Sequence, residues 1–454
     1  MKEQIMNKNR FTRLGFILAA AGSAVGLGNI WKFPYITGEN GGGVFVMVYL
    51  LTVIFIGMSI FIAEVVLGSR VNKDSVSTVE TLAPKSKKYW RYTGFTFLTG
   101  VIILSFYAIV VGWILNYIVI AATALPSSVS EAETVFLGLL KEDIVSQLIY
   151  YTLGFLIIAY TISKGIKKGI ERLNNVLMPA LLIILLCMFF YSMTLDGFHQ
   201  AVEFMFYPNF EKFHASSIII AVGHAFFTLS LGMATIITYS ASLGKDVNIV
   251  KASISIVTLD TLIAIVSGLI IFAIVYSAGQ EPSKGPGLVF ITLPAIFYEM
   301  GSIGNLMAIA FFIALAFASI TSSVSILEPT VMYLVERRKM SRTKATYGVS
   351  AFFYLLGVFA LLSNTNEFSS ALTFGSKNLF DWLDFVTAAI LLPIGGIFVA
   401  LFVGYIMDKN VVREALIPFM GEKFFAIWLF LIRYIAPLAI IIVMLNETGI
   451  VKFQ

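Results

Sequence analysis

The chain has 454 residues, of which 58% are hydrophobic and only 13% are charged, and its mean hydropathy is +0.90. A soluble fold needs much more polar surface, so this composition excludes a soluble domain and indicates a polytopic membrane protein. The net charge of +5 does not indicate a nucleic-acid partner, because the basic residues lie in short loops beside apolar segments, where the lipid bilayer explains them.

Eleven apolar stretches are long enough to cross a bilayer, which takes about 20 residues per helix. They cover residues 14–36, 43–68, 92–124, 146–163, 170–194, 216–241, 248–278, 304–335, 346–363, 382–407 and 424–445. We therefore expect one all-α transmembrane domain over residues 1–454. The first stretch is expected to be a retained helix, because ten more spans follow it.

The distribution of Lys and Arg predicts the orientation of these spans. Basic clusters fall at the N-terminus and in every second connection, at residues 2–13, 70–91, 164–172, 245–251, 337–344 and 409–423. By the positive-inside rule these segments are cytoplasmic. An odd number of spans then places the N-terminus in the cytoplasm and the C-terminus outside.

The sequence does not favour an enzyme. Only three histidines are present, and no motif pairs one of them with a nucleophile. Cys187 is the only cysteine, which excludes an internal disulfide and a cysteine metal cluster.

A glycine-rich break interrupts the first span between Ala21 and Pro34, where the sequence reads AGSAVGLGNIWKFP. A helix in hydrocarbon must satisfy its own backbone, so a break at this depth is expected only where the freed groups bind something or line a cavity. For a single break, close helix packing by glycine is the alternative.

A second break is predicted in the sixth span, where Thr228, Ser230 and Gly232 lie at mid-membrane. The two breaks occupy corresponding positions if residues 14–194 and 216–407 are two five-helix repeats and 424–445 is an extra helix. Half-helix N-termini suit a carboxylate, and unwound carbonyls suit a cation such as Na⁺. The pair of breaks therefore predicts a transporter site for an amino acid with sodium.

These motifs resemble the neurotransmitter:sodium symporter family. The resemblance rests on five runs of residues, namely 13–34, 39–43 (ENGGG), 227–232 (FTLSLG) with Thr238 and Tyr239, 318–323 (ASITSS) and 381–384 (DWLD). It implies the five-plus-five inverted-repeat fold of the leucine transporter, with helices 1 and 6 broken and an eleventh helix added. It also implies a bacterial amino-acid transporter of the inner (plasma) membrane.

By the same resemblance, two all-oxygen sodium sites are expected, as a hard cation requires. The first would use Ala24, Asn29, Thr228 and Asp260 together with the substrate carboxylate. The second would use the carbonyls of Gly22, Val25 and Ala318 with the hydroxyls of Thr321 and Ser322. Hydroxyls in membrane helices also serve as helix–helix contacts, which is the alternative for residues 321–323.

The resemblance also implies a substrate pocket. Its residues would be Ala24, Gly26, Leu27, Gly28, Ile103, Tyr107, Phe227, Thr228, Ser230, Met233, Ser322, Ser323 and Ile326. Monoamine carriers of the family have an aspartate at the position of Gly26, so this chain resembles an amino-acid carrier. The walls formed by Ile103, Phe227, Met233 and Ile326 are apolar, which favours hydrophobic or aromatic substrates.

Several residues depart from the family pattern. Asp260 occupies a position more often held by asparagine and could supply the negative charge that relatives take from chloride, so no chloride requirement is expected. Lys32 replaces an arginine in the outer gate, where its partner would be Asp384. Tyr239 and Glu336 are expected at the inner gate, with Lys8 or Arg10 as a possible partner of the carboxylate.

Together these features predict sodium-coupled import of hydrophobic or aromatic L-amino acids by alternating access. Two alternatives stay open, namely a proton-coupled permease of the same fold, with Asp260 or Glu64 as proton carrier, and an amino-acid sensor that does not transport. The expected partners are the amino acid and the lipid bilayer, with no nucleic acid. The sequence leaves the oligomeric state, the preferred amino acid and the sodium stoichiometry open.

Overall fold

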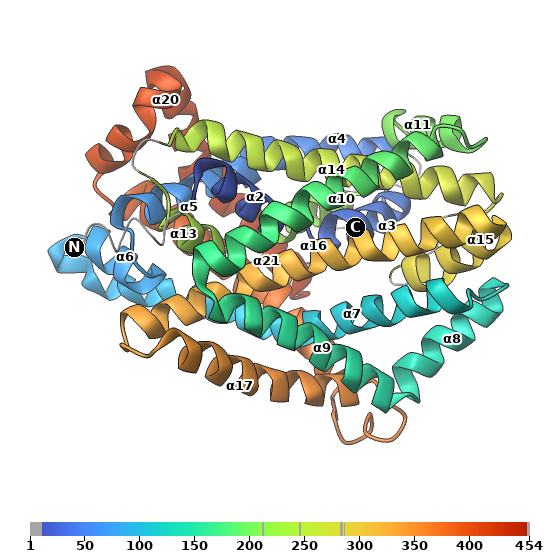
Figure 1. Ribbon diagram of the computed structural model, residues 1–454. Coiled ribbons are helices and arrows are strands. Elements are labelled where there is room, and N and C mark those ends of the chain that lie inside the picture. Colours follow the sequence, from blue (N-terminus) through green and yellow to red (C-terminus); the bar gives the residue numbers. More distant parts are fainter. Residues whose placement is uncertain (1–10, 211–212, 245–246, 282–284, 286, 452–454) are drawn as a thin grey trace.

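The computed structural model describes residues 11–210, 213–244, 247–281, 285 and 287–451, and these residues form a bundle of roughly parallel helices (Figure 1). The helices α6 (Ser75–Leu82) and α20 (Lys409–Phe430) lie at one end of the bundle. The helices α8 (Val129–Lys141), α11 (Phe198–Phe206) and α15 (Leu293–Glu299) lie at the other end.

Helices of the first half follow the predicted spans closely. In chain order they are α2 (Arg13–Ala24), η1 (Gly28–Lys32), α3 (Phe33–Glu39), α4 (Gly43–Thr52), η2 (Val53–Gly57), α5 (Met58–Val71), α6, η3 (Lys85–Thr96), α7 (Phe97–Thr123), α8, α9 (Ile144–Ser163), η4 (Ile166–Glu171), α10 (Arg172–Ser192) and α11. The η segments are π-helical turns that continue the neighbouring helices, except η3, which is a 3₁₀ segment.

The second half of the chain is also mostly helical. Its elements are α12 (Ala215–Thr228), α13 (Thr235–Ser240), α14 (Ile249–Ser277), η5 (Leu288–Thr292), α15, α16 (Gly301–Glu336), α17 (Arg342–Leu362), β1 (Thr373–Phe374), β2 (Lys377–Asn378), α18 (Leu379–Phe385), η6 (Val386–Leu391), α19 (Leu392–Leu401), η7 (Phe402–Ile406), α20, η8 (Leu431–Ile435) and α21 (Ala436–Glu447). The two strands form a small antiparallel hairpin with Thr373 opposite Asn378.

Within the described ranges, nine helical segments are long and apolar enough to cross a membrane, and the bent pair α2 with η1–α3 makes a tenth. The sixth predicted span is divided between α12 and α13, with six residues between them. Each of these two pieces is too short to span a bilayer alone, which is why the sixth of the eleven predicted spans is not among the ten spanning segments.

Hydrogen bonds hold the N-terminal end of the first span in place. The hydroxyl of Thr12 accepts a hydrogen bond from the amide of Gly15 at 3.0 Å and so caps α2. The carboxylate of Glu171 in span five accepts the amide of Thr12 at 3.2 Å. The start of α2 is therefore attached to η4, and α2 runs on between α10, α14 and α16.

Candidate functional site: two broken helices around a closed cavity

The first break lies between α2 and η1, whose axes differ by 48°. The amide of Gly26 donates to Asn29 Oδ1 at 3.1 Å, and the amide of Leu27 donates to Tyr107 Oη at 3.2 Å. Both amides are buried and lack a partner inside a helix, so these side chains satisfy them. The break predicted from the glycines is therefore held open by polar side chains from η1 and α7.

The second break lies between α12 and α13. Ser230, Gly232 and Ala234 all have positive φ, at 53°, 78° and 60°. At Gly232 a Cβ would also stand 2.4 Å from the carbonyl oxygen of Leu392, so only glycine fits. The amide of Gly232 donates to Glu64 Oε1 at 2.8 Å, which gives this fully buried carboxylate a role in holding the unwound segment.

The two breaks meet at the carbonyl of Ser23. The hydroxyl of Ser230 donates to this oxygen at 2.8 Å, and the hydroxyl of Ser322 in α16 donates to it at 3.3 Å. Sequence patterns gave no reason to single out Ser23, because its side chain is not used in these contacts. One unwound carbonyl thus connects span one with spans six and eight.

Three of the residues predicted for the first sodium site form one buried cluster. Thr228 Oγ1 lies 3.0 Å from Asn29 Oδ1 and 3.1 Å from Asp260 Oδ1. Asn29 Nδ2 donates to Asp260 Oδ1 at 2.8 Å. Ala24, whose carbonyl is the fourth predicted ligand, adjoins them at the end of α2. The donor set is oxygen-rich and carries one carboxylate, which fits a hard monovalent cation.

The residues predicted for the second sodium site lie between α2 and α16. The hydroxyl of Thr321 donates to the carbonyl of Ala318 at 3.0 Å, and a Cβ at Gly22 would stand 3.2 Å from Thr321 Cβ. Val25 forms the C-cap of α2, one turn beyond Gly22. Every one of these residues is buried, and their oxygens also fit a hard cation. Among the described residues, no group of three His, Cys, Asp or Glu side chains could hold a transition metal.

A small cavity of about 20 Å³ lies between the two breaks. It is lined by Ala24, Gly26, Leu27, Gly28, Ile103, Tyr107, Phe227, Thr228, Ser230, Met233, Ser322 and Ile326. Ser323, the remaining residue predicted for the substrate, does not line it, because its hydroxyl turns back to the carbonyl of Ser319 at 2.8 Å. At Gly26 a Cβ would stand 3.1 Å from Tyr107 Oη and 3.3 Å from Ser322 Oγ, so the missing side chain keeps the cavity open.

An outer cavity of about 200 Å³ lies next to the first and shares Leu27, Tyr107 and Phe227 with it. Lys32 and Asp384, the predicted outer gate, both line this cavity, but they do not form an ion pair. Instead, Lys32 Nζ lies 4.7 Å from the centroid of the Phe227 ring. The gate lysine therefore rests on the aromatic ring that separates the two cavities.

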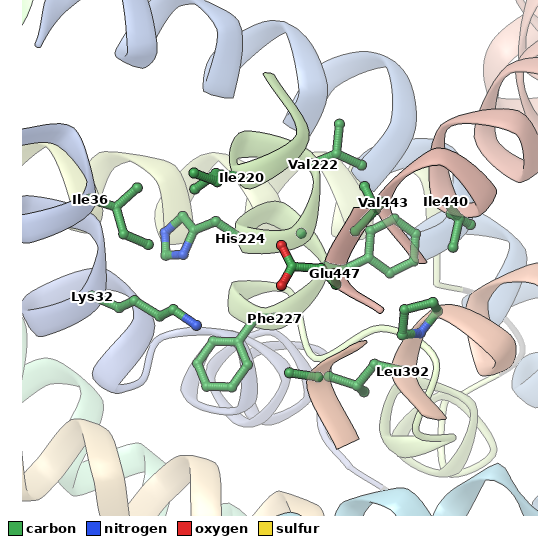
Figure 2. Close-up of a pocket in the computed structure, with 14 residues that line it drawn as sticks. Lys32, Ile36, Ile220, Val222, His224, Phe227, Leu392, Ile440, Val443 and Glu447 are labelled. Atoms are coloured by element: carbon green, nitrogen blue, oxygen red, sulfur yellow. The ribbon is translucent and has the colours of Figure 1, made fainter. Parts of the chain in front are cut away.

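Figure 2 shows a further cavity on the other side of Lys32, between α12, α19 and α21. The lysine side chain extends toward Phe227, and the carboxylate of Glu447 in α21 faces the same space. The imidazole of His224 also borders it and packs on Tyr49, with ring centroids 5.4 Å apart. His224 thus lies beside Lys32. Its ring nitrogens make no hydrogen bond to Asp260.

The predicted inner-gate residues have different partners. The ring of Tyr239 packs edge-on against Phe11 at 5.4 Å. Glu336 Oε2 accepts the backbone amide of Asp74 at 2.6 Å. Lys8 and Arg10, the suggested partners of Glu336, lie outside the described residues.

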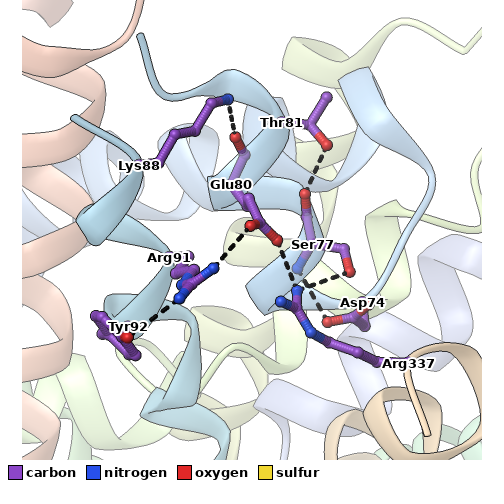
Figure 3. Close-up of polar contacts among 8 residues, drawn as sticks. All are labelled: Asp74, Ser77, Glu80, Thr81, Lys88, Arg91, Tyr92 and Arg337. Atoms are coloured by element: carbon purple, nitrogen blue, oxygen red, sulfur yellow. Dashed lines mark hydrogen bonds and ion pairs between the residues drawn. The ribbon is translucent and has the colours of Figure 1, made fainter. Parts of the chain in front are cut away.

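Ion pairs also hold the segment that follows α5 to the end of α16 (Figure 3). Glu80 in α6 pairs with Arg337 at 2.7 Å and with Arg91 at 3.1 Å. Hydrogen bonds from these two guanidinium groups lower the pKa of the Glu80 carboxyl. The loop that carries Asp74 is therefore fixed at two points, by Glu80 and by Glu336.

Two further buried polar groups were not predicted from the sequence. Glu328 in α16 is fully buried and pairs with Arg342, whose Nε also donates to the carbonyl of Ile162 at 2.7 Å. Asn174 in α10 is fully buried beside Gly22. The signal in each case was a polar residue inside an apolar span, but its partner cannot be read from one sequence.

Comparisons with known proteins decide the family. The model of the sodium:neurotransmitter symporter family matches residues 8–136 and 135–454. The chain belongs to this family. It is a sodium-dependent transporter embedded in the membrane and not an enzyme, as predicted.

Individual relatives agree over the full length. An uncharacterized sodium-dependent transporter of Bacillus subtilis, YhdH, is 36% identical, with 97% of this chain and 98% of the relative covered. An uncharacterized sodium-dependent transporter of Haemophilus influenzae is 33% identical, with 97% and 99% covered. The crystal structure of MhsT in complex with L-phenylalanine matches with a TM-score of 0.87 and 38% identity, covering 97% of this chain and 99% of MhsT. The predicted fold class is thereby confirmed.

Proposed function

We propose that this symporter imports hydrophobic or aromatic L-amino acids with sodium and does not require chloride. The proposal is carried by one observation, the apolar cavity at which both helix breaks meet. Its polar end presents the hydroxyl of Tyr107 and lies beside the amide of Leu27, which suits a carboxylate. The complex of MhsT with L-phenylalanine supports the same substrate class.

The residues at the apolar end of the cavity indicate which kind of substrate side chain would fit there. Ile103, Met233 and Ile326 line it, and the Phe227 ring separates it from the outer cavity. Methionine is a flexible wall that adapts to side chains of different shape. No carboxylate lines this cavity to pair with an amine, so a substrate with its own carboxylate fits best.

Two sodium ions are proposed to bind beside the substrate. The first would be held by Ala24, Asn29, Thr228 and Asp260, and the second by Gly22, Val25, Ala318, Thr321 and Ser322. Bound sodium would supply positive charge next to the substrate carboxylate. Asp260 would balance that charge from within the protein, which is the reason to expect transport without chloride.

Transport by alternating access would use the outer and inner gates described above, with the N-terminus in the cytoplasm and the C-terminus outside a bacterial inner membrane. Phe227 and Lys32 would close the outer side over the substrate. The cluster of Tyr239, Glu336 and the first cytoplasmic loop would close the inner side. The two five-helix repeats, 14–194 and 216–407, would supply the moving parts.

Uptake by purified protein in liposomes tests this proposal. Radiolabelled L-phenylalanine should accumulate with an inward sodium gradient at fixed pH, and replacing sodium by potassium should abolish accumulation. Replacing chloride by gluconate should leave it unchanged. Competition with all twenty amino acids should rank leucine, phenylalanine, tyrosine and tryptophan above the polar ones.

Two other outcomes identify the alternatives. Uptake that ignores sodium and follows a proton gradient would indicate a proton-coupled permease. Saturable binding without accumulation would indicate a sensor. Tyr107→Phe should weaken amino-acid binding by about 1–3 kcal/mol, roughly 5- to 100-fold, because a buried polar group loses its partner. Tyr298→Phe, at an exposed position on the outer side, is the matched control.

A further inference from the structure

Asn174 is a fully buried polar residue in span five. One polar atom of its side-chain amide has a hydrogen-bond partner and the other has none. Its Nδ2 donates to the carbonyl of Ile170 at 2.9 Å, one turn earlier in α10. Its Oδ1 accepts no hydrogen bond from any described residue. The reverse orientation of the amide would place Oδ1 against the Ile170 carbonyl oxygen, so the hydrogen bond fixes which atom points away.

The unsatisfied oxygen points at the first broken helix. A Cβ at Gly22 would stand only 2.1 Å from Asn174 Oδ1, so the oxygen occupies the space that a side chain at this position would need. The same point lies 3.2 Å from Thr321 Cβ and 3.2 Å from Met178 Sδ. Asn174 Oδ1 therefore lies against Gly22 of α2, and Thr321 of α16 borders the same point.

We propose that Asn174 Oδ1 is an additional oxygen ligand of the second sodium ion, supplied by span five. The inference rests on the sodium sites of the proposed function and adds a residue that the resemblance does not assign. A buried carbonyl oxygen without a donor is unfavourable unless something binds it. A sodium ion beside Gly22 and Thr321 would satisfy that oxygen, because a hard cation prefers neutral and anionic oxygen ligands.

A ligand from α10 would also connect the ion to a third helix. Without Asn174, the predicted ligands of this site come only from α2 and α16. With Asn174, sodium would join α2, α10 and α16. The side chain lies three residues beyond the π-helical turn η4, so loss of sodium would release α10 close to a place where its helical hydrogen bonding is already irregular.

Sodium binding without substrate tests the inference directly. The measured quantity is the sodium concentration that gives half of the maximal rise in melting temperature of the purified protein. Asn174→Leu keeps the size of the side chain but removes the oxygen, and it should raise this concentration about tenfold or more. Asn174→Asp keeps an oxygen and adds charge, so its half-saturating concentration should lie at or below that of the unchanged protein.

The neighbouring Asn175 offers a matched control, because it is exposed and Asn175→Leu makes the same chemical change at a position that faces away from Gly22. This variant should respond to sodium like the unchanged protein. Thr321→Val should also weaken the response, and adding Asn174→Leu to it should have less than the product of the two single effects, because both side chains act on one ion.

The outcomes separate this inference from the proposed function. If the unchanged protein responds to sodium while Asn174→Leu and Asn175→Leu respond equally, Asn174 is not a ligand. If Asn174→Leu and Asn174→Asp weaken sodium binding to the same extent, the residue acts through packing and the inference is wrong. If the unchanged protein itself does not respond to sodium, the proposed sodium coupling fails.

Discussion

Asn29 donates a hydrogen bond to the carboxylate of Asp260, with 2.8 Å between Nδ2 and Oδ1. A second contact, from Asn29 Nδ2 to the Asp260 carbonyl at 2.9 Å, fixes the same amide against α14. The amide oxygen of Asn29 is thereby left to face Gly26 and Thr228. The orientation of the Asn29 side chain, which we propose as a sodium ligand, is thus decided by Asp260 in the seventh span.

Asp260→Asn should make uptake depend on chloride. The substitution preserves the size of the side chain but removes the negative charge that would balance the first sodium ion. We expect sodium-driven uptake in gluconate buffer to fall by at least about tenfold, because the bound ion loses its buried counter-charge, and to recover when chloride is added. Asp196→Asn, at an exposed position, should change uptake neither in gluconate nor in chloride. Equal uptake by Asp260→Asn with and without chloride would contradict the proposed charge balance.

Gly26→Ala should weaken substrate binding without unfolding the protein. Its methyl group would stand 3.1 Å from Tyr107 Oη, at the end of the cavity proposed for the carboxylate. Overpacking of this size costs about 1–3 kcal/mol, so the half-saturating amino-acid concentration should rise roughly 5- to 100-fold. Gly138→Ala is the control, because nothing lies within 4 Å of its added methyl group. Unchanged binding in Gly26→Ala would show that the substrate lies elsewhere.

The outer gate can be tested by exchanging its charges. Lys32→Glu and Asp384→Lys should each lower uptake by roughly fivefold, because each replaces an attraction across the outer cavity by a repulsion at a partly exposed site. The double variant restores opposite charges and should recover most of the uptake. If it remains as poor as the single variants, Lys32 and Asp384 do not form the gate, and Glu447 becomes the acidic partner to test.

Arg342→Met should lower stability strongly. It leaves Glu328 fully buried without its cationic partner, which costs about 3–5 kcal/mol. Melting temperature in detergent measures the effect. Replacing both residues, with Glu328→Leu added, should recover part of the loss because no uncompensated charge remains. Arg413→Gln is a suitable comparison, because its partner Glu422 is exposed and the melting temperature should hardly change.

Helix α6 should detach more readily when Glu80 is protonated. The two arginines lower the pKa of this carboxyl in the folded state, so its contribution is complete above the unfolded-state pKa of about 4.3 and is lost as the pH falls through the lower folded-state value. Glu80→Gln mimics the protonated form at neutral pH. Hydrogen exchange at residues 75–82 should be faster in this variant than in the unchanged protein or in Glu133→Gln, and equal rates in all three would contradict the role of the ion pairs.

Much of the fold can be predicted from the sequence, because a chain that crosses a bilayer has few ways to satisfy its backbone hydrogen bonds. The long apolar stretches had to be helices, and the glycines between Ala21 and Pro34 had to mark a break whose backbone groups find partners. The structure has that break at residues 25–27 and the second one at 229–234. The cavity between the breaks is lined by every residue that the family resemblance implied for the substrate except Ser323.

Only the tertiary structure shows which helix faces meet and in which direction each side chain points. Ser323 turns into its own helix, and Lys32 lies on Phe227 without pairing with Asp384. Asn174 and Glu328 were visible as polar residues in apolar spans, but only the packing of α10 against α2 and the approach of Arg342 to α16 show what they meet. One sequence gives the depth of such a residue in the membrane, whereas its partner depends on how separate helices rotate against one another.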